Sequence, residues 1–287
     1  MAMLSAIGVD VGGTKITAGR VDGGVLAAEV TVSTAETAQG VLRQIDDLIS
    51  ALDAPGVAAI GIGAPGRVDS ATATVLSGGY VDLSGLPLNQ RLAALKGRPL
   101  FADNDANMAL VGEARQGAGR GLAHLVMLTI GTGIGGAAMD SGRILHGRGT
   151  AGELGHIGID INGEPCLCGR RGCLETASSG TALRRLIAAA GMPPETRVQD
   201  LLARDDAAAR ALIAAWALPL RAGIESLVAA FDPQLVVLGG GLGEAACAAL
   251  SRFPTVSPWY RNDVAPAQFG NRAGVIGAAI AALEALS

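Results

Sequence analysis

Side chains able to act on a polyhydroxylated ligand are concentrated in the run Asp103-Asn104-Asp105-Ala106-Asn107. Two glycine-rich stretches accompany it, Asp10-Val11-Gly12-Gly13-Thr14-Lys15 and Gly131-Thr132-Gly133-Ile134-Gly135-Gly136. Glycine-rich turns present backbone N–H groups that bind phosphate, and an aspartate can hold a metal-bound water. Carboxylates and amides beside a phosphate-binding backbone are typical of sugar phosphorylation.

Phosphoryl transfer needs mainly positioning and charge stabilisation, with one carboxylate that accepts the proton of the attacking hydroxyl. Asp103 and Asp105 are two residues apart, so the residues alone leave both open as the general base. The competing interpretation is that the acidic run is a solvated surface turn. Either aspartate therefore remains a candidate at this point.

Three of the four cysteines, Cys166, Cys168 and Cys173, lie within eight residues. In a protein without a secretory signal such a cluster favours a metal site over a disulfide framework, with a redox-active or inert cluster as the alternative. Cys247 stands alone in an alanine-rich helical pattern and is interpreted as a small buried hydrophobe. The cluster therefore predicts one metal site.

The composition predicts a compact globular protein that handles small molecules. The chain has 287 residues, 49% hydrophobic and 17% charged, which is enough for about two domains. Its 26 acidic and 22 basic residues include no basic run, so nucleic-acid and membrane-surface binding are not expected. The N-terminus has no signal-peptide features, and Ala211 to Phe231 contains Arg221, Glu225 and Pro219, so we expect a cytoplasmic protein without a membrane span.

Strand and helix patterns alternate along the chain in two similar halves, which predicts an α/β fold. Expected strands are 5–9, 16–21, 25–30, 57–62, 125–130, 143–145 and 235–238, and expected helices are 41–52, 181–190, 206–231 and 274–286. The glycine-rich stretches at Gly12-Gly13 and 129–136 follow strands as hairpin-like turns. Pro219 should kink or split its helix, because an interior proline costs about 3 kcal/mol.

Two common nucleotide-binding motifs are excluded. The stretch Gly61-Ile62-Gly63-Ala64-Pro65-Gly66 fits G-x-G-x-x-G, but Pro65 and an extended continuation replace the helix that the dinucleotide fingerprint must open. No G-x-x-x-x-G-K-[ST] sequence occurs, which excludes a P-loop. The two hairpin-like turns remain as the phosphate-binding candidates.

The ordered motifs resemble those of the ROK family, which comprises bacterial glucokinases, N-acetylhexosamine kinases and related sugar repressors. The resemblance runs from about residue 7 to 282 and rests on seven segments: 10–15, 61–69, 104–107, 129–136, 151–156, 166–175 and 236–242. It implies the actin-like ATPase fold, in which two ribonuclease-H-like lobes enclose a cleft. Residues 1–108 and the helix 274–287 would form the small lobe, and residues 109–273 the large lobe.

The same resemblance assigns ligands for ATP and Mg²⁺. Asp10 is similar to the family carboxylate that organises Mg²⁺ through water. The glycine turns would hold the phosphates, and Gly239 and Gly240 would pass near the adenosine. The implied cofactor-binding residues are Asp10, Gly12, Gly13, Thr14, Lys15, Gly131, Thr132, Gly133, Gly239 and Gly240.

For the sugar, the resemblance favours Asp105 as the base that takes the proton of the 6-hydroxyl. The implied substrate-binding residues are Gly66, Asn104, Asp105, Glu153, His156 and Glu175. His156 also completes a Cys₃His set with Cys166, Cys168 and Cys173, which suits a structural, four-coordinate Zn²⁺. One ring nitrogen would bind the metal and the other a sugar hydroxyl. His124 and His146 are interpreted as surface or loop residues.

Glucose ranks first as substrate and an N-acetylhexosamine second. The family's glucokinases usually carry Asn-Leu followed by Trp where this chain has Ser77-Gly78-Gly79-Tyr80, so the sugar-side loop departs from the pattern. A DNA-binding repressor is disfavoured because the first glycine turn begins at Asp10, and a non-catalytic sugar sensor is disfavoured by Asp105. The resemblance suggests a homodimer or homotetramer.

Overall fold

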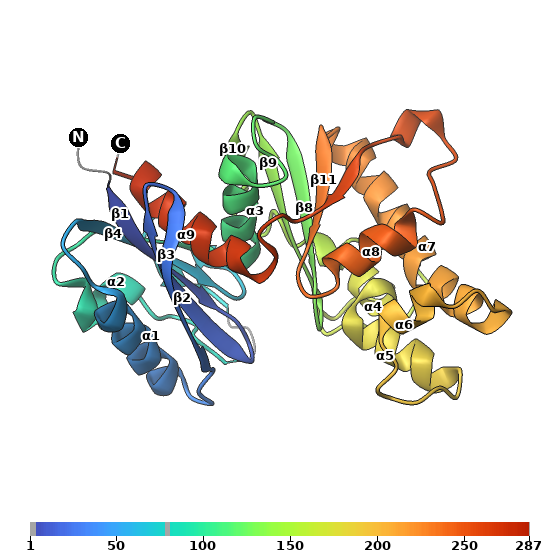
Figure 1. Cartoon of the computed structure of the whole chain (residues 1–287), viewed down its shortest axis with the longest axis horizontal. Helices are drawn as coiled ribbons and strands as arrows, with labels where there is room; N and C mark the ends of the chain where they lie inside the picture. The colour runs from blue at the N-terminus through green and yellow to red at the C-terminus, as the bar shows by residue number, and fades with distance from the viewer. Residues whose placement is uncertain (1–3, 78–80, 287) are drawn as a thin grey trace. The chain divides into compact units, whose positions relative to one another are not determined.

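The computed structural model describes residues 4–77 and 81–286 (Figure 1). The chain divides into two compact units. The first unit contains residues 1–120, 146–150 and 272–287, and the second contains residues 121–145 and 151–271. Residues 78–80, which carry most of the departure from the glucokinase loop pattern, lie outside the described residues.

The first unit is built on a five-stranded sheet in the order β3-β2-β1-β4-β7. Its strands are β1 (Ser5–Val11), β2 (Lys15–Asp22), β3 (Val25–Ser33), β4 (Val57–Ala64) and β7 (Leu100–Asn104). The first three are antiparallel, whereas β4 and β7 run parallel to β1. The hairpin predicted at Gly12-Gly13 is confirmed as the β1–β2 turn.

The second unit repeats this order as β10-β9-β8-β11-β12. Its strands are β8 (Leu125–Ile130), β9 (Ile134–Asp140), β10 (Arg143–Ile144), β11 (Leu235–Gly239) and β12 (Val264–Pro266). Again three antiparallel strands are followed by two parallel ones. The predicted division into two similar α/β halves is therefore confirmed, as is the second hairpin-like turn.

Alternating residues of β1 face two different helices, as the period of a strand requires. Ile7 and Val9 belong to the core that packs against α1 (Ala38–Leu52), whereas Ala6 packs with Ala279 of α9 (Ala273–Glu284). Figure 1 shows α1 and α9 on opposite faces of this sheet. On the α9 face Gly8 is required, because a Cβ there would lie 1.9 Å from the carbonyl oxygen of Val275.

Helix α3 (Asp105–Gln116) belongs wholly to the first unit, so the domain boundary expected at residue 108 falls inside this helix. It packs against α9, and the two backbones approach at Gly112 and Gly277. A Cβ on Gly277 would lie 1.7 Å from the carbonyl oxygen of Met108. The close approach binds α3 to α9 and so keeps both helices in one unit.

Helix α7 (Ala207–Phe231) is one continuous helix of 25 residues, so Pro219 does not split it. Ala215, whose carbonyl loses its N–H partner at Pro219, is exposed and can be solvated. By length and composition α7 alone among the described helices would suffice to span a membrane. Its buried face, including Ile213, Trp216 and Leu220, instead forms the core of the second unit.

The remaining elements are short or cover the two sheets. In the first unit they are β5 (Val68–Asp69), β6 (Thr74–Val75), α2 (Leu88–Arg91) and the 3₁₀ turns Ala93–Leu95 and Gly270–Arg272, the last at the unit boundary. In the second unit they are α4 (Leu174–Ser178), α5 (Gly180–Ala189), α6 (Val198–Ala203), α8 (Gly243–Leu250) and the 3₁₀ turns Leu154–His156 and Pro258–Tyr260.

Candidate functional site

Acidic residues of the first unit meet at the carboxyl ends of its parallel strands. The strand register places Asp10 of β1 opposite Gly63 of β4, and Gly63 opposite Asp103 of β7. Gly63 allows β4 to lie close to the start of α3, because a Cβ at this position would be 3.3 Å from the Cα of Asp105. Ligands of open α/β sheets bind at such strand ends. The sequence-predicted residues Asp10 and Asp105 are therefore neighbours, although 95 positions separate them in the chain.

Asp10 has a strongly perturbed carboxyl group. Burial, and after it the negative charge of Asp105, raise its pKa to about 7, while the positive charge of Lys15 opposes the shift. The start of α9 lies against this carboxyl, since a Cβ on Gly274 would be 2.8 Å from its Cγ. Two acidic groups held close together in this way are suited to a divalent cation, which removes their mutual repulsion.

The junction between β7 and α3 is fixed by three neighbouring side chains. Asn104 caps α3 by accepting hydrogen bonds from the N–H groups of Ala106 and Asn107, at 2.9 and 3.3 Å. Its Nδ2 donates to the carbonyl oxygen of Gly66 at 2.9 Å. Asp103 is 3% exposed, and its Oδ1 accepts from the Asn104 N–H at 2.7 Å and from Asn107 Nδ2 at 2.9 Å. The acidic run is therefore an ordered helix start rather than a solvated turn.

His146 was not among the predicted site residues, yet its Nε2 lies 2.6 Å from Oδ2 of Asp103. The hydrogen bond to Asp103 raises the pKa of His146. His124 agrees better with the expectation of a surface histidine, since its partner Asp140 is itself exposed. No periodicity or motif marks His146, because its partner is supplied only by the fold.

The turn after β1 is stabilised by its own backbone. Gly12 donates its N–H to the carbonyl oxygen of Lys15 at 3.0 Å and accepts from Thr34 Oγ1 at 2.8 Å. A Cβ on Gly12 would lie 2.8 Å from that same Lys15 oxygen. Thr14 and Lys15 are exposed at this turn, where their hydroxyl and ammonium groups can reach a ligand.

The second unit brings two predicted glycine segments together. Strands β8 and β11 are parallel and Thr129 pairs with Gly239, so the turns that follow them are adjacent. Gly240 has φ +74°, and a Cβ there would lie 2.5 Å from the carbonyl oxygen of Ile130. The Gly131 turn is closed by a hydrogen bond from its N–H to the Gly133 oxygen at 2.9 Å. The proposed phosphate and adenosine segments thus share one sheet edge.

Two acidic residues of the second unit have defined neighbours. Oε2 of Glu175 accepts the N–H of Ile134 at 2.8 Å, and a Cβ on Gly133 would approach the same oxygen to 2.3 Å. The carboxyl of Glu153 lies 4.0 Å from Nε2 of His156. Glu175 therefore contacts the glycine turn, and Glu153 lies beside the histidine.

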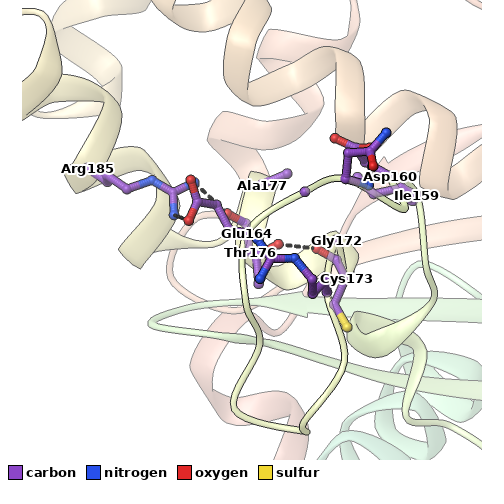
Figure 2. A pocket seen from close by; sticks show the side chains of 11 residues that line it. Ile159, Asp160, Glu164, Gly172, Cys173, Thr176, Ala177 and Arg185 are labelled. Atoms are coloured by element: carbon purple, nitrogen blue, oxygen red, sulfur yellow. Dashed lines mark hydrogen bonds and ion pairs between the residues drawn. The ribbon is translucent and has the colours of Figure 1, made fainter.

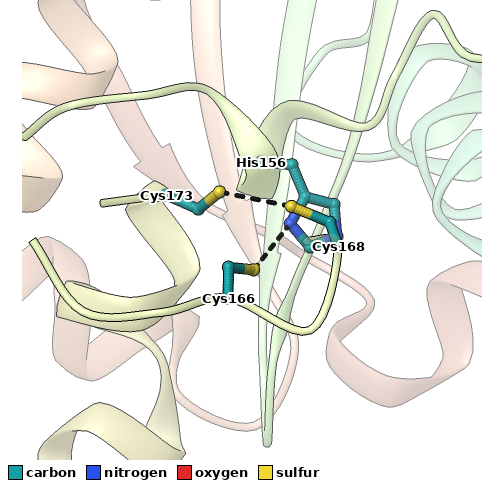
Figure 3. A group of neighbouring side chains, drawn as sticks. All are labelled: His156, Cys166, Cys168 and Cys173. Carbon is teal, nitrogen blue, oxygen red and sulfur yellow. Dashed lines mark hydrogen bonds between the residues drawn. The ribbon is translucent and has the colours of Figure 1, made fainter. Parts of the chain in front are cut away.

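The predicted Cys₃His set is assembled in the second unit (Figure 3). Its four ligand atoms all lie within 4.8 Å of one another, with 3.4 Å between Cys166 Sγ and His156 Nδ1 and 3.5 Å between Cys168 Sγ and Cys173 Sγ. Zn²⁺ with bonds of about 2.0–2.3 Å separates tetrahedral ligands by roughly 3.3–3.8 Å. Nδ1 faces Cys166, which leaves Nε2 for the side of Glu153.

The cysteine thiols have different environments. A backbone hydrogen bond from Arg170 lowers the pKa of Cys168 to about 6, whereas burial raises the pKa of Cys173 to about 12. A cation that binds thiolates removes the cost of ionising a buried thiol. The donor set and its spacing therefore fit a structural Zn²⁺, and all four positions would be filled by protein.

A cavity of about 350 Å³ lies beside the loop that carries Cys173 (Figure 2). Asp160 and Glu164 oppose Arg171 and Arg185 around it, so its charges balance. Arg185 is already occupied, because it donates to the carbonyl oxygen of Thr176 at 2.9 Å. Cys173 is its one residue in common with the sequence-predicted site, so this cavity is separate from the proposed sugar and ATP ligands.

The ROK family profile matches residues 6–285. A glucokinase of Thermotoga maritima is 35% identical over 267 residues, covering 85% of this chain and 84% of that protein. A Streptomyces coelicolor glucokinase is 34% identical over 315 residues, with 97% of each covered. An N-acetylmannosamine kinase of Pasteurella multocida is 30% identical over 286 residues, covering 96% and 95%.

Solved structures show the same fold. The ROK hexokinase of Thermus thermophilus superposes with a TM-score of 0.83 at 34% identity, covering 99% of both chains. A ROK family glucokinase of Streptomyces griseus, solved in complex with glucose and AMPPNP, gives a TM-score of 0.83 at 32% identity, with 98% and 99% covered. The predicted actin-like ATPase fold of the two ribonuclease-H-like units is confirmed by these neighbours.

Proposed function

The chain belongs to the ROK family, and on that premise we propose that it is an ATP-dependent hexose kinase. It transfers the γ-phosphate of ATP to the 6-hydroxyl of a hexose, with glucose as the first candidate. The observation that carries the proposal is the pairing of Asp10 with Asp105 at the ends of β1 and β7, where one carboxylate can serve the cation and the other the sugar. Full-length similarity to glucokinases supports the same activity.

Asp105 is the proposed general base. It accepts the proton of the sugar 6-hydroxyl as that oxygen attacks the γ-phosphorus and ADP departs. Asp103 does not suit this role, because its buried carboxylate already accepts from Asn104, Asn107 and the ring of His146. The remaining proposed sugar ligands are Gly66, Asn104, Glu153, His156 and Glu175.

ATP is proposed to use the glycine segments of both units. In the first unit these are Gly12, Gly13, Thr14 and Lys15, and in the second they are Gly131, Thr132, Gly133, Gly239 and Gly240. Mg²⁺ bound with the nucleotide neutralises phosphate charge during transfer. Asp10 would hold a water of that ion, and because its pKa is raised to about 7, a cation would compete with a proton for this half-buried carboxyl near neutral pH.

The proposed Zn²⁺ is structural. His156, Cys166, Cys168 and Cys173 would fill its coordination sphere, and the ion would fix the ring direction of His156. Since Nδ1 faces Cys166, the Nε2 of this histidine is the nitrogen left for a sugar hydroxyl. The metal would thereby order His156 and, through Cys173, the start of α4, which carries Glu175.

The second candidate acceptor is an N-acetylhexosamine, favoured by the 30% identity to the Pasteurella multocida N-acetylmannosamine kinase. Glucose ranks above it because the glucokinase relatives are 34–35% identical. We also propose a cytoplasmic homodimer or homotetramer that acts on small molecules and does not bind nucleic acid.

A coupled ADP-release assay tests the proposal. Purified protein with ATP and Mg²⁺ is offered glucose, mannose, fructose, N-acetylglucosamine and N-acetylmannosamine, with a no-sugar reaction as the ATPase control. The proposal expects glucose to have the highest kcat/KM. A preference for an acetamido sugar would replace the first candidate by the second. ADP release no faster than the control with every sugar would refute the kinase.

A further inference from the structure

We propose that His146 is a positioning residue for Asp105. It acts through Asp103, whose carboxylate fixes the junction at which β7 ends and α3 begins. The functional part of this inference rests on the proposed kinase activity. The structural part concerns only contacts within the first unit and can be tested without turnover.

Asp103 is the link between the two residues. Its Oδ1 binds the N–H of Asn104 and the side chain of Asn107, so one oxygen holds residues on both sides of Asp105. Its Oδ2 faces His146 Nε2 at 2.6 Å. The orientation of the Asp103 carboxylate therefore sets the path of the backbone through Asp105. His146 fixes that orientation because it binds the second oxygen, Oδ2.

The environment makes His146 important to this arrangement. The Asp103 side chain is only 5% exposed, so water cannot readily replace His146 as its hydrogen-bond donor. The His146 side chain is itself 42% exposed. Loss of a donor to a buried carboxylate leaves a desolvated charge that must move or find another partner. The raised pKa of His146 agrees with a charge-assisted bond. We expect the β7–α3 junction to shift when this donor is removed.

The chain around His146 is itself anchored. Residues 146–150 belong to the first unit, whereas the segments before and after them, 121–145 and 151–271, belong to the second. Arg67 Nε donates to the carbonyl oxygen of Gly149 at 2.9 Å and provides a second attachment. His146 therefore belongs to a five-residue segment that contacts the first unit at Asp103 and, independently, at Arg67.

The chain contains a matched control pair. His124 Nδ1 lies 2.6 Å from Asp140 Oδ1, the same distance as in the His146 pair, but the two side chains are 43% and 58% exposed. Exposed ion pairs contribute little because water screens and replaces them. If His146 acts only as a surface histidine, its removal should resemble the removal of His124.

The first experiment compares steady-state kinetics of H146A, H146Q, H146N and H124A, normalised to folded protein. A glutamine amide nitrogen is as many bonds from Cβ as Nε2 of histidine, whereas the asparagine amide nitrogen is one bond closer. We expect H146A and H146N to lower kcat by about tenfold with KM for ATP within about twofold, because misplaced catalytic groups lose rate. The kcat of H146Q should be within about threefold of the parent value, and the kcat of H124A should equal the parent value.

Two kinetic outcomes would overturn the inference. One is a kcat for H146A equal to that of H124A, even if its melting temperature falls, since that is the result of a purely structural role. The other is H146Q no more active than H146N, because the hydrogen bond to Asp103 would then not be the cause.

The second experiment needs no activity and separates this inference from the proposed function. Hydrogen exchange measured by mass spectrometry should show faster exchange in peptides covering 101–110 in H146A than in the parent, and little change in H146Q or H124A. Unchanged exchange in H146A would refute the positioning role. If the parent releases no ADP with any sugar, the kinase proposal fails, and this experiment still decides whether His146 orders the junction.

Discussion

The close packing of α3 on α9 leads to a strong prediction for Gly277→Ala. The new Cβ would lie 1.7 Å from the carbonyl oxygen of Met108 and 2.7 Å from the N of Gly112, both backbone atoms. A carbon–oxygen contact needs roughly 3.3–3.6 Å, so the helices must separate by about 1.6 Å or deform. Overpacking of this kind costs up to about 3 kcal/mol, while alanine in place of glycine in a helix returns about 1 kcal/mol. We expect a net loss of about 2 kcal/mol.

The same displacement should reach the proposed base. Met108 lies three residues after Asp105, within the first turn of α3. A shift of about 1 Å at a catalytic group can lower the rate by about 10²-fold. We therefore expect Gly277→Ala to lower kcat by one to two orders of magnitude in protein that is still folded at 25 °C, with a melting temperature about 5 °C lower.

Circular dichroism melts, urea titrations and the coupled assay measure these effects. Both tryptophans, Trp216 and Trp259, belong to the second unit, so their fluorescence does not report the first unit directly. Gly223→Ala of α7 is the matched control, because the three atoms nearest to its Cβ all belong to the Leu174 side chain, the first at 2.8 Å, and a side chain can rotate. If Gly277→Ala proves as stable and active as Gly223→Ala, the close-packing argument is wrong.

Three further predictions concern the base, the metal and acid stability. Asp105→Asn should lower turnover by roughly 10²-fold or more, because the amide cannot accept the proton, while the sugar Kd from calorimetry should change little. Glu36→Gln, at an exposed position, is the control. An active Asp105→Asn variant would exclude Asp105 as the base. Elemental analysis should find one zinc per chain, and Cys168→Ser should weaken sugar binding before ATP binding; full activity of that variant would contradict the structural metal. Asp53, whose pKa is lowered to about 2 chiefly by Arg98 and then by Lys96, should contribute about 1 kcal/mol above pH 4 after solvent screening. Because the folded pKa is depressed, that contribution disappears as the pH falls from about 4 towards 2, so urea titrations of Asp53→Asn should differ from the parent at pH 7 and converge in acid.

Local signals explain the parts of the fold that the sequence predicts well. Strand β8 begins and ends at the expected residues, because an apolar run is bounded by a glycine turn. Helix α3 was not predicted. Residues 106–114 are all buried, so the helix lacks the polar face that gives an amphipathic pattern. Helix α7 remains whole at Pro219 because Ala215, whose carbonyl loses its N–H partner, is exposed and can be solvated, which the sequence does not reveal.

The candidate site likewise contains residues that the sequence predicts and residues whose role only the fold reveals. The three cysteines could be predicted as a metal site from their type and spacing, whereas His156 was added through the family resemblance, and the four residues do converge. Asp103 could not be separated from Asp105 by residue type. The distinction comes from burial and from His146, which is 43 positions away and reaches Asp103 only in the folded unit. Asp103→Asn should disturb the β7–α3 junction, because an amide would present a donor where the carboxylate accepts three hydrogen bonds.

Glycine determines the distances between the acidic groups of the first unit. Gly63 has no side chain to separate β4 from the Cα of Asp105, and Gly274 allows α9 to approach the carboxyl of Asp10. Any side chain at either position would meet Asp10 or the start of α3 and push these groups apart. The raised pKa of Asp10 is the electrostatic consequence of this burial beside Asp105, and it is greatest when no cation is bound. The packing that holds these two acids together is therefore unfavourable by itself, and a divalent cation at the proposed site would bind more tightly because it relieves their repulsion.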